Sequence, residues 1–304
     1  MIWAALIGNA LIALAKFITA AISGSVALLA EAAHSVADTF NQVFLLIGLS
    51  LGEKPPDEQH PYGHGKDRFF WAFVTAVMLF LLGAFFSIYE GSQKLLEALR
   101  GEAVSGSHFW SYIALGVAVV FESYSLSVGI SETRKGMQQE GKTFAQFFRS
   151  TKDPALKTVL FEDSAALLGL VFALIGIYLV DATGNQWWDG LASILIGLVL
   201  AAVAFLLAAQ SRGLLLGAAA SREERKKIRK ALTSSDRVCK VIDVLTMHLS
   251  PQEVLVTAHI EVEGVSSANE MEEVIDGLER EIKKEVPTAT LIFIEPQSGD
   301  KRDG

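Results

Sequence analysis

The sequence predicts a helical membrane domain of six spans followed by a cytoplasmic α+β domain of the ferredoxin-like type. Apolar stretches of about 20 residues, long enough to cross a bilayer, recur through the first two thirds of the chain. Charged residues and short alternating segments then replace them. A hydrophobic content of 51% is also too high for an ordinary soluble protein. We therefore expect a membrane domain at 1–216 and a C-terminal domain at 217–304.

The candidate spans follow one another with short connections. The first contains Lys16 and has neither a basic leading region nor a small-residue cleavage site. These features favour a true span over a cleaved signal peptide. The predicted spans are 2–22, 26–50, 69–92, 109–130, 155–180 and 188–216.

Basic residues are concentrated in the connections after the second and fourth spans. Because cytoplasmic loops carry an excess of Lys and Arg, we expect both termini in the cytoplasm and the protein in the inner membrane of a bacterial cell. The residues counted are Lys54, Lys66, Arg68, Arg134, Lys135, Lys142, Arg149, Lys152 and Lys157.

Net charge and cysteine content limit the function classes. The net charge of −8 argues against a nucleic-acid partner. Cys239 is the single cysteine, which excludes an internal disulfide framework and a thiolate metal cluster. Any metal chemistry must therefore rest on histidine and carboxylate side chains.

The C-terminal domain has the predicted order α-β-β-α-β. Amphipathic patterns predict the helices, and alternating apolar residues predict the strands. This order places two helices on one face of a three-stranded sheet. About 80 residues suffice for one modest core, which association would strengthen. The expected elements are helix 221–234, strands 240–249 and 254–263, helix 266–286 and strand 289–295.

A polar stripe runs along the second span. Glu31, His34, Asp38 and Asn41 follow one another at steps of 3, 4 and 3, so they share one helical face. Ionisable groups at that depth are costly, which favours a ligand site at His34 and Asp38 over hydrogen bonds between packed helices. Glu31 lies nearer the non-cytoplasmic end, where solvation is the alternative to a ligand role.

Further carboxylates lie in the fourth and fifth spans. Glu162 and Asp163 are adjacent, so they point about 100° apart around the helix and only one can comfortably face a given partner. A cation or an internal proton would explain carboxylates in hydrocarbon. Glu122 has three open roles: metal ligand, proton carrier, or hydrogen-bond partner of nearby hydroxyl groups.

The connection after the second span reads PPDEQHPYGHGK. Asp57, His60 and His64 bring one carboxylate and two imidazoles around a tight turn, a set that suits zinc or a similar divalent ion. The alternative is a solvated interfacial loop.

With these motifs in place, the chain resembles the cation diffusion facilitators, a family of proton-coupled divalent-metal antiporters, over nearly its whole length. Within that family it is similar to the branch that includes the animal mitochondrial zinc exporter. The resemblance is carried by HSVAD at 34–38, DEQHPYGHGK at 57–66, WWDGLASILIGLVL at 187–200 and IFIEP at 292–296.

The resemblance implies a transport site made of His34, Asp38 and Asp163. The fifth-span histidine that the family commonly has four residues before Asp163 is Val159 here. Glu162, Glu122 or water are then the candidates for the fourth ligand. The resemblance also implies a second, loop metal site at Asp57, His60 and His64.

In the C-terminal domain the resemblance implies a dimerisation and regulatory role. His259 stands where the family commonly has a metal ligand and Glu295 at a plausible carboxylate position, but Phe293 replaces a histidine. Lys66 keeps the family's basic position after the loop turn, whereas Gly217 stands where relatives have its partner carboxylate.

The expected function is therefore proton-coupled efflux of divalent cations, most of all Zn²⁺, by a homodimer embedded in lipid. Manganese, iron, cobalt and nickel are alternative cargoes, and a metal-binding membrane sensor is an alternative function. The sequence lacks the HExxH-type helix of a metalloenzyme, so we expect a transporter with no organic cofactor, in which zinc is the cargo and a possible regulatory ligand.

Overall fold

The protein is described from a computed structural model at residues 2–24, 26–100, 109–141, 143–144, 146–147 and 154–297. The chain separates into two compact units. Unit 1 comprises Met1–Ser50 and Arg68–Arg212, and unit 2 comprises Leu51–Asp67 and Gly213–Gly304. The loop between the second and third apolar helices thus groups with the C-terminal part, which the sequence does not indicate. The domain boundary at residues 216 and 217 stays a prediction.

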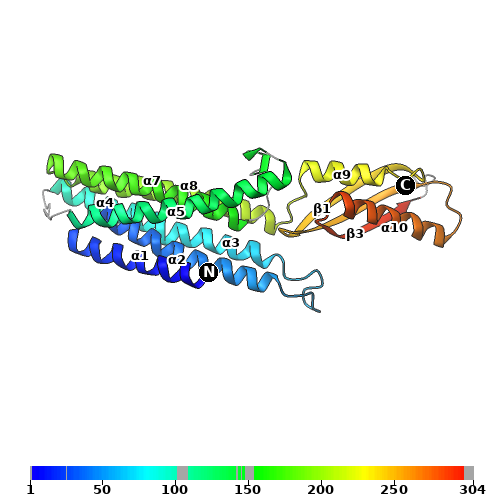
Figure 1. Cartoon of the computed structure of the whole chain (residues 1–304), viewed down its shortest axis with the longest axis horizontal. Coiled ribbons are helices and arrows are strands. Elements are labelled where there is room, and N and C mark those ends of the chain that lie inside the picture. The colour runs from blue at the N-terminus through cyan, green and yellow to red at the C-terminus, as the bar shows by residue number, and fades with distance from the viewer. Residues whose placement is uncertain are drawn as a thin grey trace. The chain divides into compact units, whose positions relative to one another are not determined.

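Long helices build unit 1 (Figure 1). Five of the described helices are long and apolar enough to cross a membrane, and they correspond to the second to sixth predicted spans. The described apolar part of the first helix is the shorter stretch Ala13–Ile22, so the count of six spans stays a prediction. The helices are α1 (Ile2–Ser23), α2 (Val26–Gly52), α5 (Phe109–Glu140), α7 (Pro154–Thr183) and α8 (Trp187–Leu215).

The third predicted span is one continuous helix with a change of winding in its middle. It consists of α3 (Asp67–Met78), the π-helix η1 (Leu79–Phe85) and α4 (Phe86–Arg100). Three residues used to predict the orientation, Lys142, Arg149 and Lys152, lie outside the described residues. The orientation of the termini also stays a prediction.

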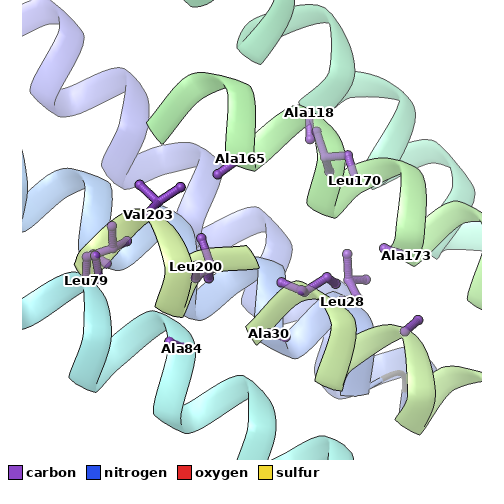
Figure 2. Packing of buried hydrophobic residues seen from close by; sticks show 14 of the residues in the cluster. Leu28, Ala30, Leu79, Ala84, Ala118, Ala165, Leu170, Ala173, Leu200 and Val203 are labelled. Atoms are coloured by element: carbon purple, nitrogen blue, oxygen red, sulfur yellow. The ribbon is translucent and has the colours of Figure 1, made fainter. Parts of the chain in front are cut away.

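Small side chains dominate the core of unit 1. Alanines of α2, α5 and α7 pack with leucines of η1 and α8, and Figure 2 shows these side chains pointing into the space that the helices share. Small residues let membrane helices approach closely. Where α4 contacts α8, a Cβ on Gly91 would lie 2.7 Å from the carbonyl oxygen of Gly190. This contact therefore requires glycine.

The WWDG motif fixes the start of α8 against α2. Asp189 accepts a hydrogen bond of 2.7 Å from the backbone N–H of Val26, one of the donors that the first turn of a helix leaves unpaired. A motif that carries the family resemblance thus has a local structural role, because it caps the helix that holds the polar stripe.

The C-terminal part of unit 2 has the element order predicted from the sequence. Its sheet has the order β1-β2-β3, with β1 and β2 antiparallel and β2 and β3 parallel. The finer name, ferredoxin-like, stays a prediction. The elements are α9 (Arg222–Leu232), β1 (Val238–Ser250), β2 (Glu253–Val262), α10 (Ala268–Glu285) and β3 (Ala289–Gln297).

The two helices cover one face of this sheet. Alternate residues of β2, from Val254 to Ile260, are buried against α9 and α10, as the alternating pattern predicted. A capping box at Ser221 and Glu224 starts α9. The opposite face exposes large apolar side chains, among them Leu245 and Phe293.

Candidate metal centre

The polar stripe of α2 holds the first two candidate ligands. His34 Nδ1 lies 3.7 Å from Asp38 Oδ1, and the His34 side chain is buried whereas Asp38 is 17% exposed. Both ring nitrogens of His34 and Oδ1 of Asp38 lack a hydrogen-bond partner among the described residues. Buried polar atoms are nearly always paired. An imidazole and a carboxylate left in this state suit a cation that binds both.

The adjacent acids of α7 point to different neighbours, as their spacing predicted. Glu162 accepts a hydrogen bond from the Asn41 side chain on α2. Asp163 accepts one of 2.8 Å from the Ser125 hydroxyl on α5. Of the two, Glu162 is therefore the one bound directly to the α2 stripe.

Glu122 on α5 completes a cluster of like charges. It interacts electrostatically with Asp38, Glu162 and Asp163, and Asp38 interacts with both acids of α7. Three helices thus bring four carboxyl groups together in an apolar bundle. Because like charges repel strongly in such surroundings, this cluster favours a bound cation or bound protons.

The intramembrane side chains do not converge as closely as those of the loop. Among the described residues, one group of three metal-ligating side chains has ligand atoms that all lie within 4.8 Å of one another, and that group is Asp57, His60 and His64. For His34, Asp38 and Asp163 to hold one ion, the side chains must close further.

Asp57 organises the loop site. Its Oδ1 accepts hydrogen bonds from the backbone N–H groups of Gln59 at 3.0 Å and His60 at 2.6 Å. The same oxygen lies 3.3 Å from His60 Nδ1, and Oδ2 lies 3.0 Å from His64 Nε2. The hydrogen bond with His64 and that from the His60 backbone lower the pKa of Asp57 to about 2. The carboxylate is therefore ionised at neutral pH.

Asp67 was not among the predicted ligands, although it belongs to the same network. Its Oδ2 lies 3.5 Å from His64 Nδ1, on the side of the ring opposite Nε2. A carboxylate at one ring nitrogen fixes the ring and leaves the other nitrogen to bind metal. The spacing of three residues between His64 and Asp67, at the start of α3, was the available sequence signal.

The loop lies against the end of β1 within unit 2. A Cβ on Gly65 would lie 2.7 Å from the carbonyl oxygen of Leu249 and 2.6 Å from Cβ of Ser250. Lys66 Nζ lies 3.9 Å from the sulfur of Met247. Glycine at position 65 thus allows the loop to approach the strand.

The third group of candidates lies on the exposed face of the sheet. His259 Nε2 lies 3.2 Å from Glu295 Oε2 on the neighbouring strand. Asp243 on β1 is directly opposite His259 in the register, so three ionisable residues form a row across the sheet. The exposed Phe293 is on β3 two residues before Glu295. His248 is buried, with its Nδ1 3.4 Å from the carbonyl oxygen of Ser250, and does not belong to the row.

Sequence reasoning also missed a role for Lys16. Its Nζ lies 2.7 Å from the Ser35 hydroxyl and 3.5 Å from Glu31 Oε2, and all three side chains are buried. The ion pair joins α1 to the α2 stripe, one turn before His34. A basic residue in an otherwise apolar span, together with Glu31 at the same depth, was the available signal.

Two family models and several known proteins match this chain. The family model described as the cation efflux transmembrane domain matches residues 2–216, and that of the cation efflux protein cytoplasmic domain matches residues 220–297. The mitochondrial proton-coupled zinc antiporter of Mus musculus is 32% identical over 82% of this chain and 43% of its own length. Metal tolerance protein C4 of Arabidopsis thaliana is 34% identical over 80% of this chain and 52% of its own length.

The chain thus spans about half the length of these two relatives. An uncharacterized transporter of Methanocaldococcus jannaschii is 30% identical and matches over most of both chains, 88% of this one and 87% of its own.

Proposed function

The chain belongs to the cation diffusion facilitator family, and from this premise we propose that it exports divalent cations, Zn²⁺ first, from the cytoplasm in exchange for protons. One observation carries the proposal. His34 is buried with no hydrogen-bond partner among the described residues, and it and the neighbouring Asp38 interact electrostatically with carboxyl groups of α5 and α7 in the apolar bundle. Two ionised carboxylates would balance a divalent charge there.

The proposed cycle is alternating access. The cation binds to His34, Asp38 and Asp163 near the middle of the membrane and leaves on the other side. Protons compete for the same lone pairs, because a ligand must be deprotonated to bind metal. Proton binding to His34 and one carboxylate would therefore release the ion and couple the two fluxes. Glu162 and Glu122 are the candidates for the fourth ligand.

The test is zinc uptake into proteoliposomes driven by a pH gradient. We expect Asp38→Ala and Asp163→Ala to reduce uptake to the level of protein-free liposomes. Wild-type rates in both variants would rule the site out. Manganese, iron, cobalt and nickel in the same assay decide the cargo. If the protein were a metal sensor instead, the purified protein would bind zinc, but proteoliposomes would take up none of these metals.

The loop is a second proposed metal site, and its two imidazoles and one carboxylate favour zinc. Tetrahedral zinc with bonds of about 2.0–2.2 Å has ligand atoms about 3.3–3.6 Å apart. One ligand atom from each of Asp57, His60 and His64 lies within 4.8 Å of the other two, so small side-chain movements would bring the three atoms to this spacing. Because the loop groups with the C-terminal part of the chain, metal binding here would serve regulation rather than passage through the membrane.

We also propose a homodimer that uses the exposed face of the sheet. Leu245, Thr257 and Phe293 form a row across the three strands, and the first and last are 58% and 51% exposed. Large exposed apolar groups on one sheet face mark an association surface. In such a dimer, His259 and Glu295 would lie at the interface, where a second copy could complete a metal site. Phe293→Asp is expected to convert the dimer to a monomer in light scattering of the full-length protein.

A further inference from the structure

The buried Lys16–Glu31 ion pair is not part of the proposed set of metal ligands. The two side chains are 2% and 0% exposed, and the Lys16 ammonium also donates a 2.7 Å hydrogen bond to Ser35. An ammonium group inside an apolar bundle is costly, and a paired carboxylate offsets much of that cost. The pair therefore needs an explanation beyond stability, since two apolar residues would stabilise this position as well.

Glu31 is held between three helices. Its Oε2 faces Lys16 on α1, whereas its Oε1 approaches Gly169 on α7 so closely that a Cβ there would overlap with it. Glu31 precedes His34 by three residues and lies on the same stripe of α2. The carboxylate thus lies beside the proposed transport site, with the ion pair to Lys16 on one side and close contact with Gly169, which has no side chain, on the other.

The pair changes the charge that surrounds the site. Lys16 interacts electrostatically with His34 and Asp38 as well as with Glu31. If Lys16 cancels the charge of Glu31, the pair adds no net charge to the cluster of Asp38, Asp163, Glu122 and Glu162. Without Lys16, a further negative charge would stand one helical turn from His34.

We propose that Lys16 acts as a fixed counter-charge that keeps Glu31 out of the set of metal ligands and sets how tightly the intramembrane site holds its cation. Lys16 and Glu31 are positioning residues in this account, since neither touches the metal. The inference rests on the proposed function, because it assumes that His34, Asp38 and Asp163 bind the cargo.

The test measures zinc affinity of the full-length protein in detergent, in a background with His60→Ala and His64→Ala so that the loop does not contribute. Glu31→Gln leaves the ammonium unbalanced, and we expect zinc to bind about tenfold more weakly or worse. Lys16→Met leaves the carboxylate unbalanced, and we expect zinc to bind about tenfold more tightly. The double variant has neither charge and is expected to stay within about threefold of the background protein.

Two controls separate the explanations. Thr19→Val alters α1 at a hydroxyl that bonds to the Ala15 carbonyl oxygen of the same helix, and should leave affinity unchanged. Asp38→Asn should remove binding. If the background protein shows no binding that depends on Asp38, the proposed function fails and this inference with it. If zinc binding depends on Asp38 but Glu31→Gln and Lys16→Met do not shift the zinc affinity in opposite directions, the inference alone fails.

Glu31 as a direct ligand makes a different prediction. Affinity would then stay low in the double variant, because the ligand is missing whether or not Lys16 is present. Each single variant leaves a buried charge without its partner and is therefore at risk of not folding. If the single variants cannot be purified, the zinc affinity of the double variant decides between the two explanations. A double variant that binds zinc normally supports the counter-charge, and one that has lost zinc binding or does not fold overturns it.

Discussion

Asn41 on α2 donates a hydrogen bond to Glu162 on α7, across 121 residues of sequence. This bond turns one of two adjacent acids toward the stripe that contains His34 and Asp38, while its neighbour Asp163 bonds to Ser125 on α5. The side-chain amide thus decides which carboxylate of α7 each neighbouring helix meets.

Removing this amide is expected to impair transport without abolishing it. Asn41→Ala leaves Glu162 buried without its donor, at a cost of about 1–3 kcal/mol, so Glu162 should reorient and zinc uptake should fall about tenfold. Proteoliposome uptake measures this. Thr39→Ala is the matched control, because its hydroxyl bonds to the Ser35 carbonyl oxygen of the same helix. Equal losses in both variants would contradict the specific role of Asn41.

Val159→His should shift metal preference toward zinc. Position 159 precedes Asp163 by four residues on α7, so an imidazole there would lie on the same face as that carboxylate. Imidazole ligands favour zinc over manganese, which prefers oxygen. We expect the zinc-to-manganese ratio of initial uptake rates to rise about tenfold, roughly 1.4 kcal/mol of discrimination. Val159→Leu controls for side-chain size, and an unchanged ratio would place Val159 away from the ion.

Asp67→Asn is expected to weaken metal binding at the loop about 10- to 100-fold, the usual effect of removing the carboxylate behind a ligating histidine. Cobalt absorption of the full-length protein reports on the imidazole ligands directly. Glu58→Gln, in the same loop, should bind cobalt normally, and Asp67→Glu should recover part of the affinity. Normal binding by Asp67→Asn would show that the 3.5 Å contact with His64 does not orient the ring.

The stability of α9 should depend on pH and decrease under acidic conditions. Burial raises the pKa of Glu224, but hydrogen bonds with Ser221 outweigh burial and the net pKa is lowered. The stabilisation is therefore fully present above the pKa of about 4.3 of an unfolded glutamate, and it is lost as the pH falls through the lower folded value.

Hydrogen exchange of the α9 amides in the full-length chain measures this effect. At pH 7, Glu224→Gln should lower the opening free energy by about 0.5 to 1 kcal/mol. Once the pH falls below the lowered pKa of folded Glu224, where the natural side chain becomes neutral too, the two proteins should converge. Glu223→Gln, in the same turn but outside the capping box, is the control. A difference that persists at low pH would assign the effect to packing instead.

Local pattern made part of the candidate site predictable. His34 and Asp38 share a face at any helical geometry, and Asp57, His60 and His64 are close in sequence. The same holds for the alternating strand from Val254 to Ile260. In each case the relevant spacing is shorter than about two helical turns or one strand.

Contacts between side chains of different helices could not be predicted from the sequence. Lys16 meets Glu31, and Asn41 meets Glu162, only after the rotation of each helix in the bundle is known. The approach of Gly65 to β1 likewise depends on how a loop and a distant strand pack. The π-helical turn had no local signature in Leu79–Phe85, a stretch that reads as an ordinary apolar helix.

Because of that π-helical turn, the number of residues in the third span affects the orientation of the helix that follows. A π-helix takes more residues per turn than an α-helix, so everything after Phe85 is rotated relative to a continuous α-helix of the same length. Gly91, which meets Gly190 on α8, lies in this rotated part of the helix. Restoring regular α-helical winding without removing a residue would turn α4 by about 100°, carrying Gly91 away from α8. In evolution or engineering, the loss of this π-helical turn is therefore expected to be tolerated only together with the deletion of one residue.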